Sequence, residues 1–286
     1  MESGAPFILI GPAVPVSPVL LTVPHAGRDY PEAVVEAARV PVERLRALED
    51  RFADELVKPA VAQGASAIVA QVARAAIDLN RDPREIDPGM VEGTLAAEDL
   101  LLSGKVRAGL GLFPRRLPSC GELWRRRIPL DAARARISDI HAPYHAAIAQ
   151  RLDLIRQRFG AAILIDCHSM PPLPVRHADG PVRIVVGDRF GAGASLAAVD
   201  LVMAVIESVG LVAARNHPYA GGYTIDRHGR PRHNVHAIQI EYDRSLYLDA
   251  ALDLPGPNAD GCGRLLATIA SRLESMFRPE MPIAAE

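Results

Sequence analysis

Short apolar runs alternate along the chain with longer stretches in which apolar residues recur every three to four positions. The short runs predict strands at 18–24, 65–73, 161–167, 182–188, 211–216 and 235–242. The longer stretches predict helices at 42–63, 130–158, 193–210 and 261–277. Pro143 lies inside the second of these helices and must kink or split it. The alternation favours an α/β fold, with a largely parallel or mixed sheet covered by helices on both faces.

Polar residues occupy the ends of three predicted strands. "PHAG" follows 18–24, "DCHS" follows the apolar part of 161–167, and "IEYD" ends 235–242. Ligands collect at the carboxyl ends of strands in open α/β sheets, so we expect His25, His168 and Glu241 on one rim. Two histidines and a carboxylate can hold a catalytic zinc ion that keeps a fourth position for water. A nearby carboxylate can then accept a proton from that water.

The third zinc ligand is left open by the spacing alone. The segment "ALEDRFADEL" offers Glu49, Asp50, Asp54 and Glu55. Asp50 and Asp54 are four residues apart and would share one face of the predicted helix. A solvated acidic face is the alternative interpretation.

Arginines and glycines supply candidate substrate-binding groups. "RAAIDLNRDPR" places Arg74 at a strand end and Asn80 and Arg81 in the following loop. A guanidinium group binds a carboxylate through two parallel hydrogen bonds, although Arg81 could instead pair with Asp78 within the loop. Gly221 and Gly222 allow a ligand to approach the backbone closely. The sequence around them also carries loop histidines, more typical of surface residues than of metal ligands: His228, His233 and His236.

Length and composition narrow the class of protein. The chain has 286 residues and a net charge of −2, which predicts one domain over 1–286 and gives no basic footprint for nucleic acid. Its three cysteines include no C-x-x-C pair, which argues against a disulfide framework and a cysteine zinc site. We expect a cytoplasmic protein without membrane contact, since the N-terminal run makes a poor signal peptide and no long apolar stretch follows. The sequence predicts no oligomeric state.

Seven segments together resemble one enzyme family. They are "VPHAGRDYP", "LEDRFADEL", "RAAIDLNRDP", "APYHAAI", "IDCHSMP", "NHPYAGGYTIDRHGRP" and "HAIQIEYDRSLYLD". They occur in the order found in N-formylglutamate amidohydrolases (N-formylglutamate deformylases), and the resemblance runs from about residue 18 to 275.

The resemblance implies a fold and an activity. The fold would be a three-layer α/β/α sandwich with a mixed, largely parallel sheet, similar to zinc carboxypeptidases (phosphorylase/hydrolase-like). The activity would be zinc-dependent hydrolysis of N-formyl-L-glutamate, or a close N-acyl amino acid, to formate and the free amino acid, in histidine degradation. By the same resemblance, His25, Asp50 and His168 would bind one Zn²⁺ ion and Glu241 would be the general base. The remaining family positions would bind the substrate: Arg74, Asn80, Arg81, Gly221 and Gly222.

Two departures from the family pattern concern the substrate. Deformylases of the family commonly carry Thr-Asp-Trp where this chain has "EDRF", and the Gly-Gly loop also differs in detail. The alternatives are therefore a related metallohydrolase with another substrate, such as a carboxypeptidase-like peptidase or another N-deacylase, and a non-catalytic small-molecule binding protein.

Overall fold

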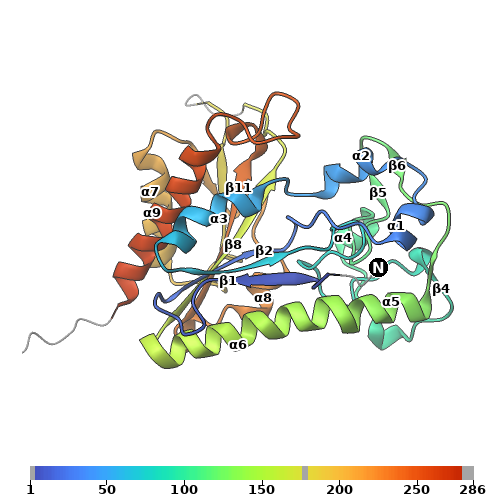
Figure 1. The fold of residues 1–286 in the computed structure, drawn as a ribbon, viewed down its shortest axis with the longest axis horizontal. Coiled ribbons are helices and arrows are strands. Elements are labelled where there is room, and N and C mark those ends of the chain that lie inside the picture. Colours follow the sequence, from blue (N-terminus) through green and yellow to red (C-terminus); the bar gives the residue numbers. More distant parts are fainter. Residues whose placement is uncertain (1–3, 176–179, 279–286) are drawn as a thin grey trace, which may run out of the picture.

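A seven-stranded sheet forms the centre of the computed structural model, which describes residues 4–175 and 180–278 (Figure 1). The strand order is β1-β3-β2-β8-β11-β9-β10. The strands, in chain order, are β1 (Phe7–Ile10), β2 (Val19–Val23), β3 (Ser66–Ala70), β8 (Ala162–Met170), β9 (Ile184–Gly187), β10 (Ala213–Arg215) and β11 (Val235–Asp243).

The sheet is mixed and largely parallel, as predicted. β2 runs parallel to β3 and β8, β8 runs parallel to β11, and β9 runs parallel to β10. β1 is antiparallel to β3, and β9 is antiparallel to β11. The adjacent strands β2, β8 and β11 therefore deliver their carboxyl ends to one edge, and Glu241 lies opposite His168 in the register.

Helices cover both faces of the sheet. Alternation along β8 sends Ile163, Ile165 and Cys167 into the core under α3, α7 and α9, and Leu164 into the core under α6. Cys167 is thus a buried thiol. The longer helices are α3 (Ala53–Ala62), α6 (Ala142–Phe159), α7 (Leu196–Ser208) and α9 (Ala259–Phe277).

Many of the shorter elements lie beside the sheet, on the right in Figure 1. Among them, α1 (Glu32–Ala37) and α2 (Val42–Leu45) pack on a small cluster that includes Val34, Leu45 and Ala76. The other short helices are α4 (Gly104–Arg107), α5 (Leu130–Arg136) and α8 (Tyr223–His228), of which α8 contacts β11. The strands are β4 (Val91–Glu92), β5 (Arg116–Leu117), β6 (Gly121–Glu122) and β7 (Ile128–Pro129). The 3-10 helices are Arg46–Leu48, Pro88–Met90, Ala97–Asp99, Pro231–His233 and Arg244–Leu246.

Two predicted helices are interrupted. The helix expected at 42–63 ends after the 3-10 turn at Leu48 and restarts as α3 at Ala53, because Phe52 adopts a left-handed conformation with φ of 56°. The helix expected at 130–158 continues past Pro143, but through a π turn at Ile137–His141 that joins α5 to α6. Pro143 has no N–H to donate to the carbonyl of residue 139, so the loss of one α-helical bond falls where the π turn already replaces that pattern.

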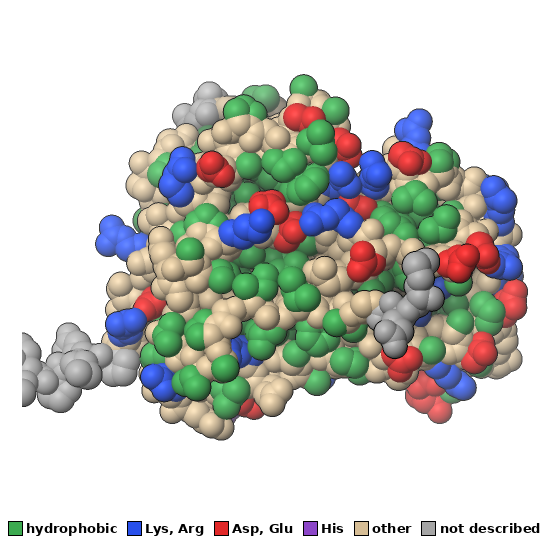
Figure 2. Space-filling model, viewed as in Figure 1, with side chains coloured by type: hydrophobic (Ala, Val, Ile, Leu, Met, Phe, Trp, Pro, Cys, Tyr) green, Lys and Arg blue, Asp and Glu red, His purple; other side chains and the backbone are tan. Residues whose placement is uncertain are grey.

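The surface and the strand limits complete the comparison with the sequence. On the face in Figure 2, acidic and basic side chains are interspersed, in keeping with the small net charge. Within the described residues, no helix combines the length and apolar character needed to cross a membrane. The sequence analysis missed the antiparallel edge strand β1, and it ended β8 too early, since His168, Ser169 and Met170 also lie within the strand.

Candidate functional site

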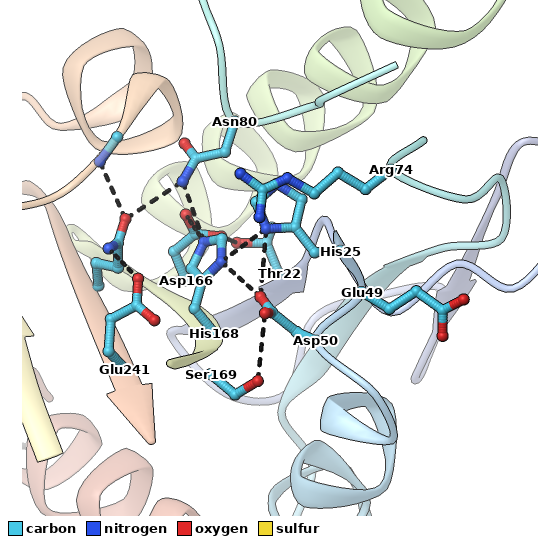
Figure 3. A network of polar contacts seen from close by, with 12 residues as sticks. Thr22, His25, Glu49, Asp50, Arg74, Asn80, Asp166, His168, Ser169 and Glu241 are labelled. Atoms are coloured by element: carbon cyan, nitrogen blue, oxygen red, sulfur yellow. Dashed lines mark hydrogen bonds and ion pairs between the residues drawn. The ribbon is translucent and has the colours of Figure 1, made fainter. Parts of the chain in front are cut away.

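Three buried side chains point toward one another at the carboxyl ends of the central strands (Figure 3). His25 follows β2, His168 lies on β8, and Asp50 lies on the turn before α3. The Nδ1 atom of His168 lies 3.1 Å from Nδ1 of His25 and 3.0 Å from Oδ2 of Asp50. Nδ1 of His25 lies 3.2 Å from the same oxygen. One ligand atom from each residue falls within 4.8 Å of the others, so this group could hold a metal ion.

Asp50 reaches this position because the chain is not helical there. Its backbone N–H donates to the carbonyl of His25 at 2.9 Å, which ties the turn to the end of β2. The predicted helix face shared by Asp50 and Asp54 is wrong, since the break at Phe52 separates them and Asp54 pairs with Arg28. The remaining acids of the segment have other partners, namely Arg51 for Glu49 and Lys58 for Glu55.

A carboxylate holds each imidazole at its far nitrogen. Nε2 of His25 lies 2.7 Å from Oδ1 of Asp78, and Nε2 of His168 lies 2.9 Å from Oδ2 of Asp166. An ionised carboxylate only accepts hydrogen bonds, so each neutral ring carries its proton on Nε2 and keeps a lone pair on Nδ1. Two imidazole lone pairs and a carboxylate oxygen therefore face one another. This donor set, with carboxylates behind the histidines, fits zinc.

The charges in the cluster also call for a cation. Burial opposes ionisation of Asp50, but its contacts with the His168 and His25 rings, which donate to it when a ring is protonated at Nδ1, outweigh burial and hold the Asp50 pKa well below its usual range. Burial likewise opposes ionisation of Asp78, and the positive charges of Arg74 and Arg81 hold its pKa well below that range. Burial disfavours a charged His168, yet Asp166 and Asp50 raise its pKa well above the ordinary value. Positive charge between the two rings, as a proton or as a metal ion, is thus strongly favoured.

Arg244 fixes the second oxygen of Asp50. Its Nη2 atom lies 3.2 Å from Oδ1 of Asp50 and 2.7 Å from the carbonyl of Glu49. Its Nε atom donates to Ser169, whose hydroxyl donates to the same oxygen of Asp50 at 3.2 Å. Oδ2 of Asp50 is thereby left to face the histidines.

Glu241 ends a chain of oriented amides. Backbone N–H groups of Thr224 and Gly222 donate to Oδ1 of Asn80 (2.9 Å) and Oε1 of Gln239 (3.0 Å), which fixes the orientation of both side-chain amides. Nδ2 of Asn80 also contacts Oε1 of Gln239 at 3.3 Å, and Nε2 of Gln239 donates to Oε1 of Glu241 at 2.9 Å. Burial raises the pKa of Glu241 to about 7. Glu241 is buried and has no ion-pair partner within the described residues, and the nearby Arg244 pairs with Asp50 instead.

The predicted substrate-binding residues lie close to the cluster, but they differ in how many of their hydrogen-bond donors already have a partner within the protein. Arg74 extends beside His25 and binds Oδ2 of Asp78 through Nε (2.8 Å) and Nη2 (2.7 Å) (Figure 3). Arg81 donates to the carbonyls of Leu110 and Asn80, and its Nη2 atom lies 3.7 Å from Oδ2 of Asp78, so the alternative pairing within the loop is present.

The two glycines serve the loop itself. Gly221 has a φ of 110°, which favours glycine, and a Cβ on Gly222 would lie 2.4 Å from the amide of Asn80. The close approach at Gly222 is therefore to Asn80, which itself lies 3.1 Å from Nε2 of His168.

The sequence analysis missed several supporting residues. Asp166 and Gln239 each stand two positions before a predicted site residue on the same strand face, and this spacing could have identified them. Thr22 lies opposite Asp166 in the pairing of β2 with β8 and donates to it at 2.7 Å, so its signal is one polar residue in an apolar strand next to β8.

Buried histidines hold the loop that contains Asn80. Nε2 of His145 lies 2.8 Å from the carbonyl of Leu79, and Nε2 of His141 lies 2.9 Å from the carbonyl of Arg81. Because a carbonyl only accepts, His145 keeps a lone pair on Nδ1, which accepts from Nε2 of His228 at 3.0 Å. The expected surface position is right for His233 but wrong for two histidines that are buried, His228 and His236.

Comparison with known proteins agrees on one family. The family model described as N-formylglutamate amidohydrolase matches residues 17–248. A protein named N-formylglutamate deformylase from Pseudomonas putida is 29% identical over 238 residues, covering 81% of this chain and 82% of its own length. One of the same name from Pseudomonas aeruginosa is 30% identical over 275 residues, covering 91% and 92%.

Solved structures give the same result for the fold. The crystal structure of an N-formylglutamate amidohydrolase from Ralstonia eutropha JMP134 is 31% identical, with a TM-score of 0.87 over 96% of this chain and 98% of that one. A gene product of Agrobacterium tumefaciens is 18% identical, with a TM-score of 0.67 over 96% of each chain, and shows likeness of fold alone.

Removal of either imidazole is expected to abolish zinc binding. His25→Ala and His168→Ala each delete one of the facing lone pairs and leave too few ligands for a stable site. Zinc content after dialysis, measured by plasma mass spectrometry, and calorimetric titration with zinc chloride check this. His233→Ala, at an exposed histidine, is the matched control and should bind zinc like the unchanged protein. Undiminished zinc binding by a folded His25→Ala or His168→Ala protein would contradict the site.

Acid is expected to destabilise the fold through the buried histidines. Burial, with the charge of Arg227, lowers the pKa of His228 from 6.5 to about 3, and burial with neighbouring histidines lowers that of His145 well below 6.5. Below about pH 6.5 these histidines bind protons in the unfolded chain but not in the folded chain. The free energy of unfolding therefore falls as the pH drops toward 3. The loss is up to about 1.4 kcal/mol per pH unit for each histidine.

Urea unfolding between pH 7 and 4.5 measures this loss. His228→Gln keeps a donor toward His145 but cannot titrate, so its stability should depend less steeply on pH than that of the unchanged protein. His233→Gln serves as the control and should retain the full slope. Equal slopes in all three proteins would show that His228 titrates normally.

Proposed function

Because the chain belongs to the N-formylglutamate amidohydrolase family, we propose that it hydrolyses the formyl amide of N-formyl-L-glutamate, or of a close N-acyl amino acid, with the help of one zinc ion. The products are formate and the free amino acid. We assign the reaction, by its family, to histidine degradation in the cytoplasm.

The observation that carries this proposal is the set of facing acceptor atoms on His25, Asp50 and His168, with a buried Glu241 beside it. When bound there, zinc lowers the pKa of a coordinated water toward about 7 and polarises a carbonyl oxygen. Asp78 and Asp166 orient the two imidazoles, and Arg244 orients Asp50. A non-catalytic binding protein would have no need of a buried carboxylate next to such a site.

Glu241 acts as the general base in this proposal. Gln239 occupies Oε1 of Glu241, which leaves Oε2 to take a proton from the attacking water. As the water oxygen bonds to the formyl carbon and the C–N bond breaks, the same proton passes to the leaving amine nitrogen. The elevated pKa of Glu241, about 7, suits a group that must both accept and return a proton near neutral pH.

Arg74 is our choice for a carboxylate of the substrate. Its guanidinium group already lies beside His25, and its Nη1 atom makes only a long contact of 3.4 Å to the carbonyl of Leu48. A second hydrolase class, a carboxypeptidase-like peptidase or another N-deacylase, would use the same zinc ligands and base. Formate release from a panel of N-formyl, N-acetyl and peptide substrates distinguishes these possibilities.

Glu241→Gln is expected to keep its zinc and bind substrate but to lose catalysis. The amide is nearly isosteric and cannot accept the proton, so kcat should fall by about 10²- to 10⁴-fold. Formate release and zinc content, measured on the same preparation, check both parts. Glu207→Gln, on the exposed side of α7, is the control. A fully active Glu241→Gln enzyme would make Glu241 a structural residue.

Arg74→Lys is expected to raise KM for N-formyl-L-glutamate by roughly tenfold or more, since an ammonium group cannot reproduce the two parallel hydrogen bonds of a guanidinium group. Arg81→Lys should have a smaller effect, because the donors of Arg81 are committed to backbone carbonyls. Steady-state kinetics of both variants, with zinc content monitored, provide the measurement. An unchanged KM in both would remove this loop from the binding site.

A further inference from the structure

A cavity of about 910 Å³, lined in part by Asn80, adjoins the catalytic cluster of His25, Asp50, His168 and Glu241. Three segments and Arg189 line it, the segments being the loop 80–85, the segment 101–108 that contains α4, and the segment 221–230 that contains α8. Asn80 is shared between the cavity and the site, since its amide lies 3.1 Å from Nε2 of His168. The volume lies near the upper end of the range for small-molecule sites, about 300–1,000 Å³.

The cavity wall carries an excess of positive charge. It contains more basic than acidic side chains: Arg81, Lys105, Arg189, Arg227 and Arg230 against Asp82, Glu85 and Asp226. Each of these acids already has a partner within the protein. Asp226 pairs with Arg189, Asp82 pairs with Arg84 at 2.8 Å, and Glu85 accepts from the hydroxyl of Ser103 and from the backbone N–H of Asp82.

Three cations of the wall, Lys105, Arg227 and Arg230, have no carboxylate partner among residues 4–175 and 180–278, and Arg230 donates to the backbone carbonyls of Asp226 and Gly229. Arg227 donates one hydrogen bond, to the Tyr223 hydroxyl at 2.9 Å, and lies over that ring at 5.8 Å. Lys105 stands on α4 and forms no ion pair within these ranges. Although Lys105 is exposed as a residue, desolvation lowers the pKa of its ammonium group, with Arg81 and Arg74 acting in the same direction. The negative charges of Asp78 and Glu241 raise the same pKa, so the ammonium group of Lys105 interacts electrostatically with carboxylates of the site.

The identity of residue 105 is itself unusual in this chain. Of 32 basic residues, lysine occurs only at positions 58 and 105, and all others are arginine. Lys58 is an exposed residue that pairs with Glu55 one turn away on α3. Lys105, by contrast, lines the cavity, where its compact ammonium group offers three donors on a flexible stem to a carboxylate.

We propose that Lys105, with Arg227, binds the side-chain carboxylate of the substrate and thereby makes the enzyme specific for N-acyl derivatives of acidic amino acids. This inference rests on the proposed function. The acyl end of the substrate lies at the zinc ligands, its α-carboxylate meets Arg74, and its side chain extends past Asn80 into the cavity. Both carboxylates of N-formylglutamate then have a cation that the protein leaves without a full set of partners.

The test compares N-formyl-L-glutamate with N-formyl-L-glutamine, which has nearly the same shape but an uncharged side chain. The zinc-loaded full-length enzyme should prefer the glutamate substrate in kcat/KM. Lys105→Gln should reduce that preference by roughly 10- to 100-fold, mainly through KM for the glutamate substrate, because it removes a charged hydrogen bond. Arg227→Gln should reduce it in the same direction. Lys58→Gln, at the other lysine, should preserve it.

Several results would overturn the proposal. Equal losses on both substrates in Lys105→Gln would make Lys105 a structural residue, and an unchanged preference would place the side chain elsewhere. Glutarate should inhibit competitively, and non-competitive inhibition would identify the cavity as a separate anion site. If the unchanged enzyme hydrolyses neither compound, the proposed function fails. Calorimetric titration with both compounds then tests Lys105 alone, and equal affinity for the two would refute its role.

Discussion

The Nδ1 atoms of His25 and His168 lie 3.1 Å apart because a buried carboxylate holds each ring at its opposite nitrogen. Neither neutral ring can donate to the other, and the third atom of the group, Oδ2 of Asp50, only accepts. Most features of the site maintain this arrangement. Thr22 and Arg74 hold the supporting carboxylates, and Arg244 occupies the other oxygen of Asp50, so the electron pairs stay directed at one point.

Much of the fold could be predicted from hydrophobic patterning, because the central strands are buried on both faces and read as apolar runs. The placement of His25, His168 and Glu241 followed from parallel strands that end at one edge. Local geometry was harder to predict. Helical spacing continues through 49–52, and nothing in its apolar pattern signals that Phe52 adopts a left-handed conformation and frees Asp50 from a helix.

The roles of polar residues depend on contacts between distant segments, which periodicity does not report. In the sequence, Gln239 is only one polar position in an apolar strand. Its orientation depends on the hydrogen bond that it accepts from the backbone N–H of Gly222, 17 residues away. The burial of His145 and His228 required knowing that α6 and α8 meet beneath the loop 79–81. Family resemblance indicated which positions carry the chemistry, whereas the hydrogen-bond directions came from the structure alone.

The π turn at Ile137–His141 joins α5 to α6 in one continuous helical segment from Leu130 to Phe159, and each half of this segment contacts a different part of the fold. On one side of the turn, Arg136 donates to the carbonyl of Ala76, and on the other, His145 contacts the loop at Leu79 and Ile148 packs in the core against the sheet. A regular α-helix turns by about 100° per residue, so deleting one residue here would rotate one half out of contact while the other stayed seated. Length changes should therefore be tolerated worse within this helix than in the loops around it, and relatives that align without gaps across it should share its irregular turn.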